Sequence, residues 1–193
     1  LKEMPNVIVK NRSQVFGYYD HNMLVMSEKL SDHLPKTKKY NPKQRLWYIR
    51  AKEVVISSGS IERPLVFGNN DTPGVMLSSA AKEYLKVYGV LVGKKPLIFT
   101  NNDSGYETAI EFKKNGVDPV VLDTRKELKS EIINEAKKLN IQIKFSYVVV
   151  AAKGYKKVKS AEVAKISDDK KKLGAIENIN CDCICVSGFW TPT

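Results

Sequence analysis

Residues 100–105, which read TNNDSG, stand where a dinucleotide-binding α/β unit carries its phosphate turn. An apolar run over residues 95–100 predicts a buried strand before the turn, and residues 104–114 predict a helix after it. Such a turn needs glycine at its first position for the bend, at its third for approach of the pyrophosphate, and at its sixth for helix packing. Gly105 alone is present, so we expect this turn not to bind a dinucleotide.

Two acidic residues bear on the same chemistry. Asp103 would place a carboxylate beside two phosphates that are already negative. Asp123 ends the next predicted strand, where an acid that binds a ribose stands about 20 residues after the turn. An acid that merely begins a turn at a strand end explains Asp123 equally well.

The other candidates for chemistry are cysteines and histidines. Cys181, Cys183 and Cys185 are spaced by two, so in a strand they share one face and are wrongly aimed to form disulfides. With no histidine or further cysteine nearby to complete a zinc site, we expect buried strand residues and no metal. His21 and His33 lie in predicted loops without a nucleophile in view, so we assign no catalytic residue.

Composition predicts an ordinary soluble globular protein. Of 193 residues, 42% are hydrophobic and 27% are charged, and the longest apolar runs are far shorter than the roughly 20 residues that span a bilayer. The net charge of +11 comes mostly from scattered lysines, with Arg present five times. We therefore expect a solvated basic surface, and neither nucleic acid nor a membrane as partner. Residues 1–5 resemble neither a signal peptide nor a natural start, so we expect the chain to begin inside a longer protein.

The pattern of apolar residues predicts an α/β fold with antiparallel meanders and a Rossmann-like βαβ unit. Helices are predicted at 78–88, with Ser78 or Ser79 as N-cap and Gly89 as the stop, at 104–114 and at 129–139. Strands are predicted at 7–9, 14–19, 23–26, 45–50, 53–60, 95–100, 119–123, 142–152 and 183–186, with further strand-like runs between 153 and 180. Residues 31–44 and 61–77 are predicted connections. We divide the chain into a meander with a final strand (1–66), a Rossmann-like unit with the degenerate turn (67–155), and a second meander with a return strand (156–193).

Several strings resemble the α subunits of heterotetrameric sarcosine oxidase, in the two-dinucleotide-binding flavoprotein superfamily. They are VFGYYDHN from Val15, GSIERPLVF from Gly59, NDTPGVM from Asn70, FTNNDS from Phe99, and CD and VSG from Cys181 and Val186. The resemblance spans nearly the whole chain and implies an interior fragment of an FAD/NAD(P)-binding-like protein. It implies that residues 1–66 are part of a first nucleotide-binding domain and that residues 67–155 are a unit inserted into it. A subunit of a related amine or opine oxidizing complex, and a non-catalytic basic interaction module, remain as alternatives.

The resemblance also implies an activity for the parent protein. Complexes of this family demethylate sarcosine oxidatively to glycine, transfer the one-carbon unit to tetrahydrofolate and form hydrogen peroxide, with NAD, FAD and FMN as cofactors. We therefore expect a cytoplasmic oxidoreductase subunit that works with other subunits on a small-molecule substrate. The main NAD-binding turn is expected outside this chain, so the chain alone should be inactive.

Contacts to the dinucleotide are implied for three stretches. Val15 and Phe16 correspond to backbone that meets the adenine, and Ser57, Ser58, Gly59 and Ser60 to small residues that pass beside the adenosine and pyrophosphate. Ser187 and Gly188 end the return strand and complete the set of cofactor-binding candidates. Glu62 and Arg63 form either a buried ion pair that braces the strand exit or a surface pair.

Overall fold

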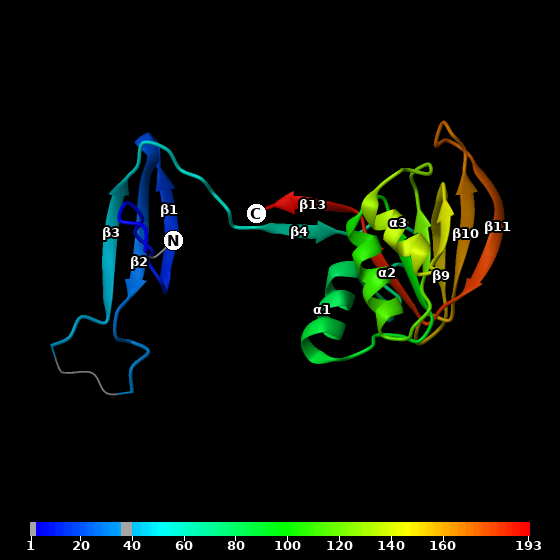
Figure 1. Cartoon of the computed structure of the whole chain (residues 1–193), viewed down its shortest axis with the longest axis horizontal. Helices are drawn as coiled ribbons and strands as arrows, with labels where there is room; N and C mark the ends of the chain where they lie inside the picture. The colour runs from blue at the N-terminus through cyan, green and yellow to red at the C-terminus, as the bar shows by residue number, and fades with distance from the viewer. Residues whose placement is uncertain (1–2, 36–39) are drawn as a thin grey trace. The chain divides into compact units, whose positions relative to one another are not determined.

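The computed structural model describes residues 3–35 and 40–193, and these fall into two compact units that are divided between Ser57 and Ser58 (Figure 1). Leu1 and Lys2, and the lysines at positions 36, 38 and 39 that belong to the predicted basic surface, lie outside the described residues. Each unit is described by itself. The division of the sequence after residues 66 and 155 stays a prediction about domains.

The first unit is an antiparallel meander of β1 (Ser13–Tyr19), β2 (Met23–Lys29) and β3 (Gln44–Arg50), in that order. A short 3-10 turn, Asp20–Asn22, joins β1 to β2. These three strands confirm the meander expected from the sequence. Residues 7–9 were predicted as a strand wrongly, because this apolar triplet has no partner strand among the described residues.

The predicted strand at residues 53–60 is also wrong over most of its length. Residues 53–59 belong to no described strand, and ladder pairing begins at Ser60. Val55 and Ile56 are 88% and 67% exposed, although the sequence pattern is that of a buried strand. A strand needs a partner for its backbone groups, and local apolar residues do not supply one.

The second unit is built on a five-stranded sheet, every neighbouring pair of which is parallel. The strand order is β5-β12-β6-β7-β8. The strands are β5 (Val75–Leu77), β6 (Pro96–Thr100), β7 (Val120–Asp123), β8 (Gln142–Phe145) and β12 (Cys183–Ser187). The buried residues of β6, β7 and β12 explain the apolar runs in the sequence, because a parallel sheet is covered on both faces.

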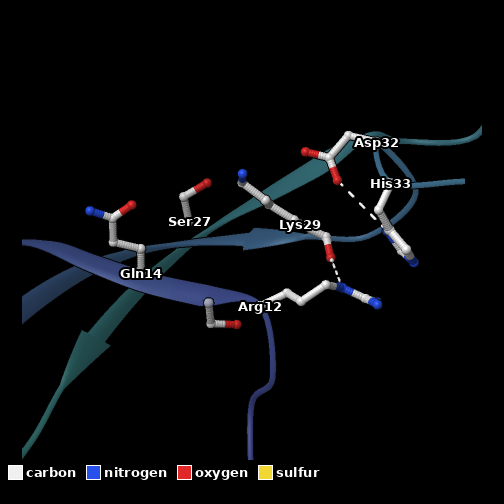
Figure 2. Close-up of a pocket in the computed structure, with 7 residues that line it drawn as sticks. Arg12, Gln14, Ser27, Lys29, Asp32 and His33 are labelled. Carbon is white, nitrogen blue, oxygen red and sulfur yellow. Dashed lines mark hydrogen bonds and ion pairs between the residues drawn. The ribbon is translucent and has the colours of Figure 1, made fainter. Parts of the chain in front are cut away.

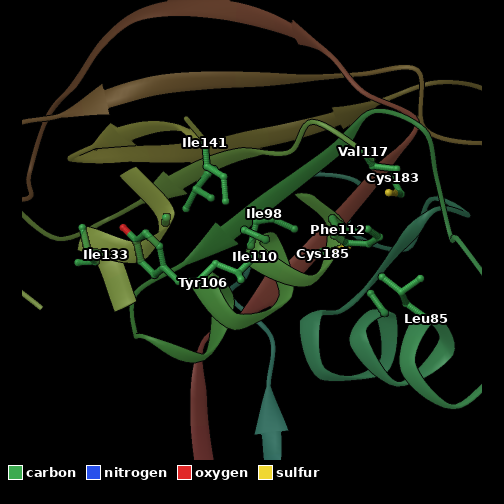
Figure 3. Packing of buried hydrophobic residues seen from close by; sticks show 14 residues of the cluster. Leu85, Ile98, Tyr106, Ile110, Phe112, Val117, Ile133, Ile141, Cys183 and Cys185 are labelled. Carbon is green, nitrogen blue, oxygen red and sulfur yellow. The ribbon is translucent and has the colours of Figure 1, made fainter. Parts of the chain in front are cut away.

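Three helices cover one face of this sheet: α1 (Ser78–Tyr88), α2 (Ser104–Lys114) and α3 (Glu131–Lys138). Their buried residues pack with Ile98, Val121, Cys183 and Cys185 in one apolar cluster (Figure 3). Gly89 ends α1 in the left-handed region at φ 65°, and its N–H donates to the Leu85 carbonyl at 3.1 Å. The predicted helix and its glycine stop are therefore confirmed.

An antiparallel sheet covers the opposite face, in the order β11-β10-β9. Its strands are β9 (Tyr147–Lys153), β10 (Ser160–Ile166) and β11 (Leu173–Asn180), and they share a second apolar cluster with Leu97, Phe99 and Val186. The predicted single strand at 142–152 is wrong. It breaks at Ser146, whose φ of 57° turns the chain from the parallel sheet into the antiparallel one.

A two-stranded antiparallel ribbon completes the second unit. β4 (Ser60–Arg63) enters it, and β13 (Phe189–Pro192) leaves directly after β12 (Figure 1). The connection predicted at 61–77 therefore contains part of β4 and the whole of β5. Through this ribbon the segment at the start of the unit lies beside the segment at its end.

The helix-on-strand contact at Gly105 yields a stability prediction. A Cβ at Gly105 would lie 2.6 Å from Cβ and 2.7 Å from Oγ1 of Thr100, so α2 can approach β6 only without a side chain. We expect Gly105→Ala to lower the free energy of unfolding by about 1–3 kcal/mol, measured by urea denaturation.

A Thr100→Gly background should reduce the cost of Gly105→Ala, because it removes the atoms that the new methyl group meets. Gly174→Ala is the matched control, since its Cβ would come no closer than 3.4 Å to the nearest atom, the Lys165 carbonyl oxygen, and should be tolerated. An equal cost for Gly105→Ala in both backgrounds would contradict this origin of the strain.

Candidate functional site

The candidate site lies where the strand order of the parallel sheet reverses. From β6 the chain proceeds to β7 and β8 on one side, whereas β12 and β5 lie on the other. Open α/β sheets bind ligands at the carboxyl ends of the two strands that flank such a reversal. Here those ends are the turn after Thr100 and the pair Ser187 and Gly188, so both predicted features meet at one place.

The side chain of Asn102 fills the space between these two strand ends. Its Nδ2 donates to the Ser187 carbonyl at 3.3 Å and to the Gly188 carbonyl. Its Oδ1 accepts from the backbone N–H of Ser104 at 2.8 Å and from the Ser187 hydroxyl at 3.2 Å. One amide therefore bridges the first turn of α2 and the end of β12.

Neighbouring residues close the turn further. Thr100 is fully buried, and its Oγ1 both donates to the Asn102 carbonyl at 2.8 Å and accepts from the Asn102 N–H at 3.1 Å. The Asn101 N–H donates to the Ser187 carbonyl at 3.3 Å. Trp190 of β13 donates from Nε1 to the Ser104 hydroxyl at 2.9 Å. The polar groups at the opening of the turn are thus hydrogen-bonded within the protein itself.

A pyrophosphate does not fit this arrangement. A working turn offers free backbone N–H groups at the helix start and open space above the glycines. In this turn the Ser104 N–H is already bound by Asn102, and the Tyr106 N–H donates to the Asp103 carbonyl at 3.1 Å. The side chain of Asn102 occupies the approach that the missing third glycine would leave open. No step of a dinucleotide reaction can be assigned to this turn.

Asp123, the acid at the end of β7, is also hydrogen-bonded within the protein. Asp123 is fully buried and accepts from the Tyr106 hydroxyl at 2.7 Å and from Arg125 at 2.8–3.1 Å. Arg125 also donates to Asp103 at 2.9 Å, so the two acids share one guanidinium. Of the two roles open from the sequence, the geometry supports the structural one, because no face of this carboxylate is presented to a ribose.

Burial and charge shift the proton affinities of this cluster. Burial, together with the hydrogen bond to Asp123, raises the pKa of Tyr106 far above its usual value. Burial opposes the charge on Arg125, but its hydrogen bonds to Asp123 and Asp103 outweigh that effect and raise its pKa. Tyr106 therefore stays a neutral donor and Arg125 a permanent cation, which makes the cluster a fixed brace.

Ser187 and Gly188, predicted as cofactor contacts, lie against this turn. Ser187 is fully buried, and Gly188 donates its N–H to the Arg63 carbonyl at 2.8 Å. A Cβ on Gly188 would come within 2.5 Å of that carbonyl oxygen, which explains the glycine by packing. Their assignment to a cofactor stays a prediction.

Val15 and Phe16 lie on β1, at the edge of the three-stranded meander. The pairing of β1 with β2 shifts register between Val15 and Gly17, so Phe16 is the extra residue of a β-bulge. Both side chains are exposed. A bulge on an edge strand frees backbone groups, as an adenine contact requires, and the assignment stays a prediction.

Ser58, Gly59 and Ser60 open the second unit, whereas Ser57 ends the first. The Ser58 hydroxyl donates to the Thr193 carbonyl, and the Thr193 N–H donates to the Gly59 carbonyl at 3.2 Å. Gly59 has a φ of 96°, which favours glycine over any other residue. These contacts do not test the cofactor role predicted for residues 57–60, which stays a prediction.

Glu62 and Arg63 adopt neither of the pairings considered from sequence. They alternate along β4, so Glu62 is buried and accepts from the Ser79 N–H at 2.8 Å, whereas Arg63 donates to the Thr191 hydroxyl at 2.7 Å. Glu62 therefore caps the first turn of α1 in place of the predicted serine. Ser78 instead donates to the Thr108 hydroxyl at 2.8 Å inside the helix layer.

The three cysteines are buried and free. Cys183 and Cys185 share the helix-facing cluster, as their spacing predicted, but Cys181 belongs to the cluster on the opposite face. Cys181 precedes β12, and a bend at Asp182 changes the side to which it points. The described residues contain no group of three or more potential ligands that could hold a metal ion.

The histidines lie in the first unit. His21 is in the turn between β1 and β2, and His33 lines a surface pocket with Arg12, Lys29 and Asp32 (Figure 2). His33 Nδ1 lies 3.8 Å from a carboxylate oxygen of Asp32. No nucleophile is brought to either histidine by the contacts of the described residues, so neither forms a catalytic pair.

The buried cysteines generate a testable pH dependence. Burial raises the pKa of Cys181 to about 12, and the hydrogen bond between the Cys185 and Cys183 thiols, together with burial, raises the pKa of Cys185. Unfolded thiols ionise near pH 9, so the contribution of these thiols to the free energy of unfolding should be constant below that pH and fall as pH rises from 9 towards 12.

Thiol labelling checks the same claim at fixed pH. The native chain at pH 8 should react with an aromatic disulfide reagent at least a hundredfold more slowly than the chain in denaturant, because the thiols are buried and protonated. Rapid labelling of the native chain would show that the β12 region is open.

Comparison with known proteins agrees with this architecture. No protein-family model matches the sequence. The chain is 37% identical over 199 residues to sarcosine oxidase subunit alpha of Rhizobium meliloti (strain 1021), a match that covers 100% of this chain and 18% of that protein. The corresponding subunit of Corynebacterium sp. (strain P-1) is 33% identical over 184 residues, covering 94% of this chain and 19% of that protein. The chain thus spans less than a fifth of these relatives.

Solved structures identify the fold. Thioredoxin reductase of Lactococcus lactis matches with a TM-score of 0.59 at 17% identity, over 77% of this chain and 48% of that one. Thioredoxin reductase of T. acidophilum matches with a TM-score of 0.56 at 16% identity, over 69% and 43% of the two chains. The fold is therefore of the FAD/NAD(P)-binding flavoprotein type, as the sequence predicted. Among the described residues, no helix has the length and apolarity to cross a membrane.

Proposed function

We propose that this chain, which resembles part of the alpha subunit of sarcosine oxidase along its whole length, acts within a flavoprotein oxidoreductase subunit of that type. The identity of 31–37% to three such subunits and the flavoprotein fold support the proposal. The parent complex would demethylate sarcosine oxidatively to glycine, pass the one-carbon unit to tetrahydrofolate and reduce oxygen to peroxide. Its other subunits would be the partners of this one.

The proposed role of this chain is part of an NAD-binding domain joined to a scaffold. Dinucleotide contacts would come from the β1 bulge at Val15 and Phe16 and from Ser57 to Ser60, whose exposed small residues leave room for a ligand. FAD and FMN of the complex would be held elsewhere. The inserted unit would contribute no cofactor contact through its own turn.

One observation carries this division of roles. Asn102 binds the α2 N-terminus and the end of β12 with its own amide, so the phosphate-binding crevice of the inserted unit is filled. A chain that used this unit for NAD would need those groups free. The dinucleotide chemistry is therefore proposed for the residues of the first nucleotide-binding domain.

Calorimetric titration of the purified chain with NAD tests the filled turn. We expect dissociation constants no tighter than about 1 mM, because Asn102 already binds the Ser104 N–H and occupies the approach to the turn, and the remaining contacts are few. Stoichiometric binding in the micromolar range would contradict the proposal.

The complete complex tests the proposed contact residues. Gly59→Val should lower the NAD content of the purified complex at least tenfold, because it adds bulk at a residue with φ of 96° and open space around it. Gly116→Val is the matched control, since Gly116 has φ of 79° and equal space but lies beyond α2.

Assembly and sarcosine-dependent peroxide formation are measured on the same preparations. The Gly116→Val complex should keep its NAD. Equal loss of NAD from both variants would assign the effect to backbone strain and remove Gly59 from the site. A wild-type complex that oxidises another amine or an opine, but not sarcosine, would overturn the substrate assignment.

A further inference from the structure

The contacts of Asn102 extend beyond the crevice that it fills. Gly188, whose carbonyl Asn102 binds, is followed directly by β13, the second strand of the ribbon. The N–H of Gly188 is bound to the carbonyl of Arg63, the last residue of β4. Asn102 thus holds the point at which both ribbon strands join the body of the second unit.

Two further contacts tie the ribbon to the same place. Trp190 of β13 donates to Ser104 at the start of α2, the residue whose N–H Asn102 binds. Arg63 of β4 donates to Thr191 across the ribbon. The turn residues therefore contact the ribbon at two places, at Gly188 directly before β13 and at Trp190 within β13.

Apart from these contacts and the hydrogen bond from the Ser79 N–H of α1 to Glu62 of β4, the ribbon has little to hold it to the body of the unit. It consists of two short strands, and Ile61, Phe189 and Trp190 are all exposed. An isolated two-stranded ribbon is marginal in water, so its direction depends on contacts at its root. At that root, the Asn102 amide and the Asn101 N–H contribute the hydrogen bonds that join the turn before α2 to the end of β12.

We infer that Asn102 is the positioning residue that fixes the β4–β13 ribbon onto the inserted Rossmann-like unit. The amide oxygen caps α2, and the amide nitrogen holds the strand end from which the ribbon departs. In this role the side chain takes over the bridging that a bound phosphate would supply. The inference rests on the scaffold role proposed above and assigns it to one side chain.

Two substitutions test the donor and the acceptor of the Asn102 amide separately. Asn102→Asp keeps an acceptor for the Ser104 N–H but replaces the donor with an oxygen that faces the Ser187 and Gly188 carbonyls. Asn102→Ala removes both functions. Asn134→Ala, at an exposed position of α3, is the matched control for loss of an asparagine.

Hydrogen exchange of the full chain, read by mass spectrometry, gives the test. Amides of β4 and β13 should exchange about tenfold faster in both Asn102 variants, whereas the first turn of α2 should exchange faster in Asn102→Ala alone. Asn134→Ala should match the wild type in all three segments.

The β10 strand serves as the internal reference, because it is buried in the opposite layer. A rise shared equally by β10 would indicate global destabilisation and overturn the local role, as would unchanged ribbon exchange in Asn102→Asp. The measurement uses no cofactor, so its failure would leave the NAD proposal standing, and failure of the NAD titration would leave the positioning role standing.

Discussion

The second unit depends on how unsatisfied backbone groups are paired at the reversal of its parallel sheet. The start of α2 presents N–H groups, and the end of β12 presents carbonyl groups, within reach of one another. Buried groups of this kind must find a partner, and in dinucleotide-binding proteins the pyrophosphate and water supply part of it. An asparagine side chain offers a donor and an acceptor together, so Asn102 binds the Ser104 N–H and the Ser187 and Gly188 carbonyls at once. The side chain of Asn102 thus makes contacts that a bound ligand makes in dinucleotide-binding proteins. This leaves the unit a scaffold role.

The cluster behind the turn makes the arrangement rigid. Asp123 is buried without solvent, and such a charge is tolerated only when it is paired and hydrogen-bonded. Tyr106 from α2 and Arg125 from the loop after β7 supply those bonds, and Arg125 extends the pairing to Asp103 at the turn itself. Because removal of one partner leaves a buried charge, the cluster holds α2, β7 and the turn in one geometry. Opening the crevice would therefore disturb more than one residue.

Much of this unit could be predicted from sequence. The missing glycines at Thr100 and Asn102 showed that the turn was altered, and the limits of α1 and α2 followed from periodicity and, for α1, from Gly89. The partners of Asn102 could not be predicted, because Ser187 lies 85 positions away and pairs with it only through the strand order. The break at Ser146 and the unpaired residues 53–59 were missed for a related reason, since both depend on which strands become neighbours. Local apolar patterns carry no such information.

The family resemblance and the geometry support one account, in which a nucleotide-binding scaffold persists after its ligand site has been filled from within. The most direct measurement of that claim is the side-chain amide resonance of Asn102 in a nitrogen–proton correlation spectrum, recorded with and without saturating NAD. The account predicts two slowly exchanging Nδ2 protons whose shifts do not change when NAD is added, because the amide is bound to the protein in both samples. A shift that follows a saturable binding curve, or rapid exchange of these protons without ligand, would contradict it.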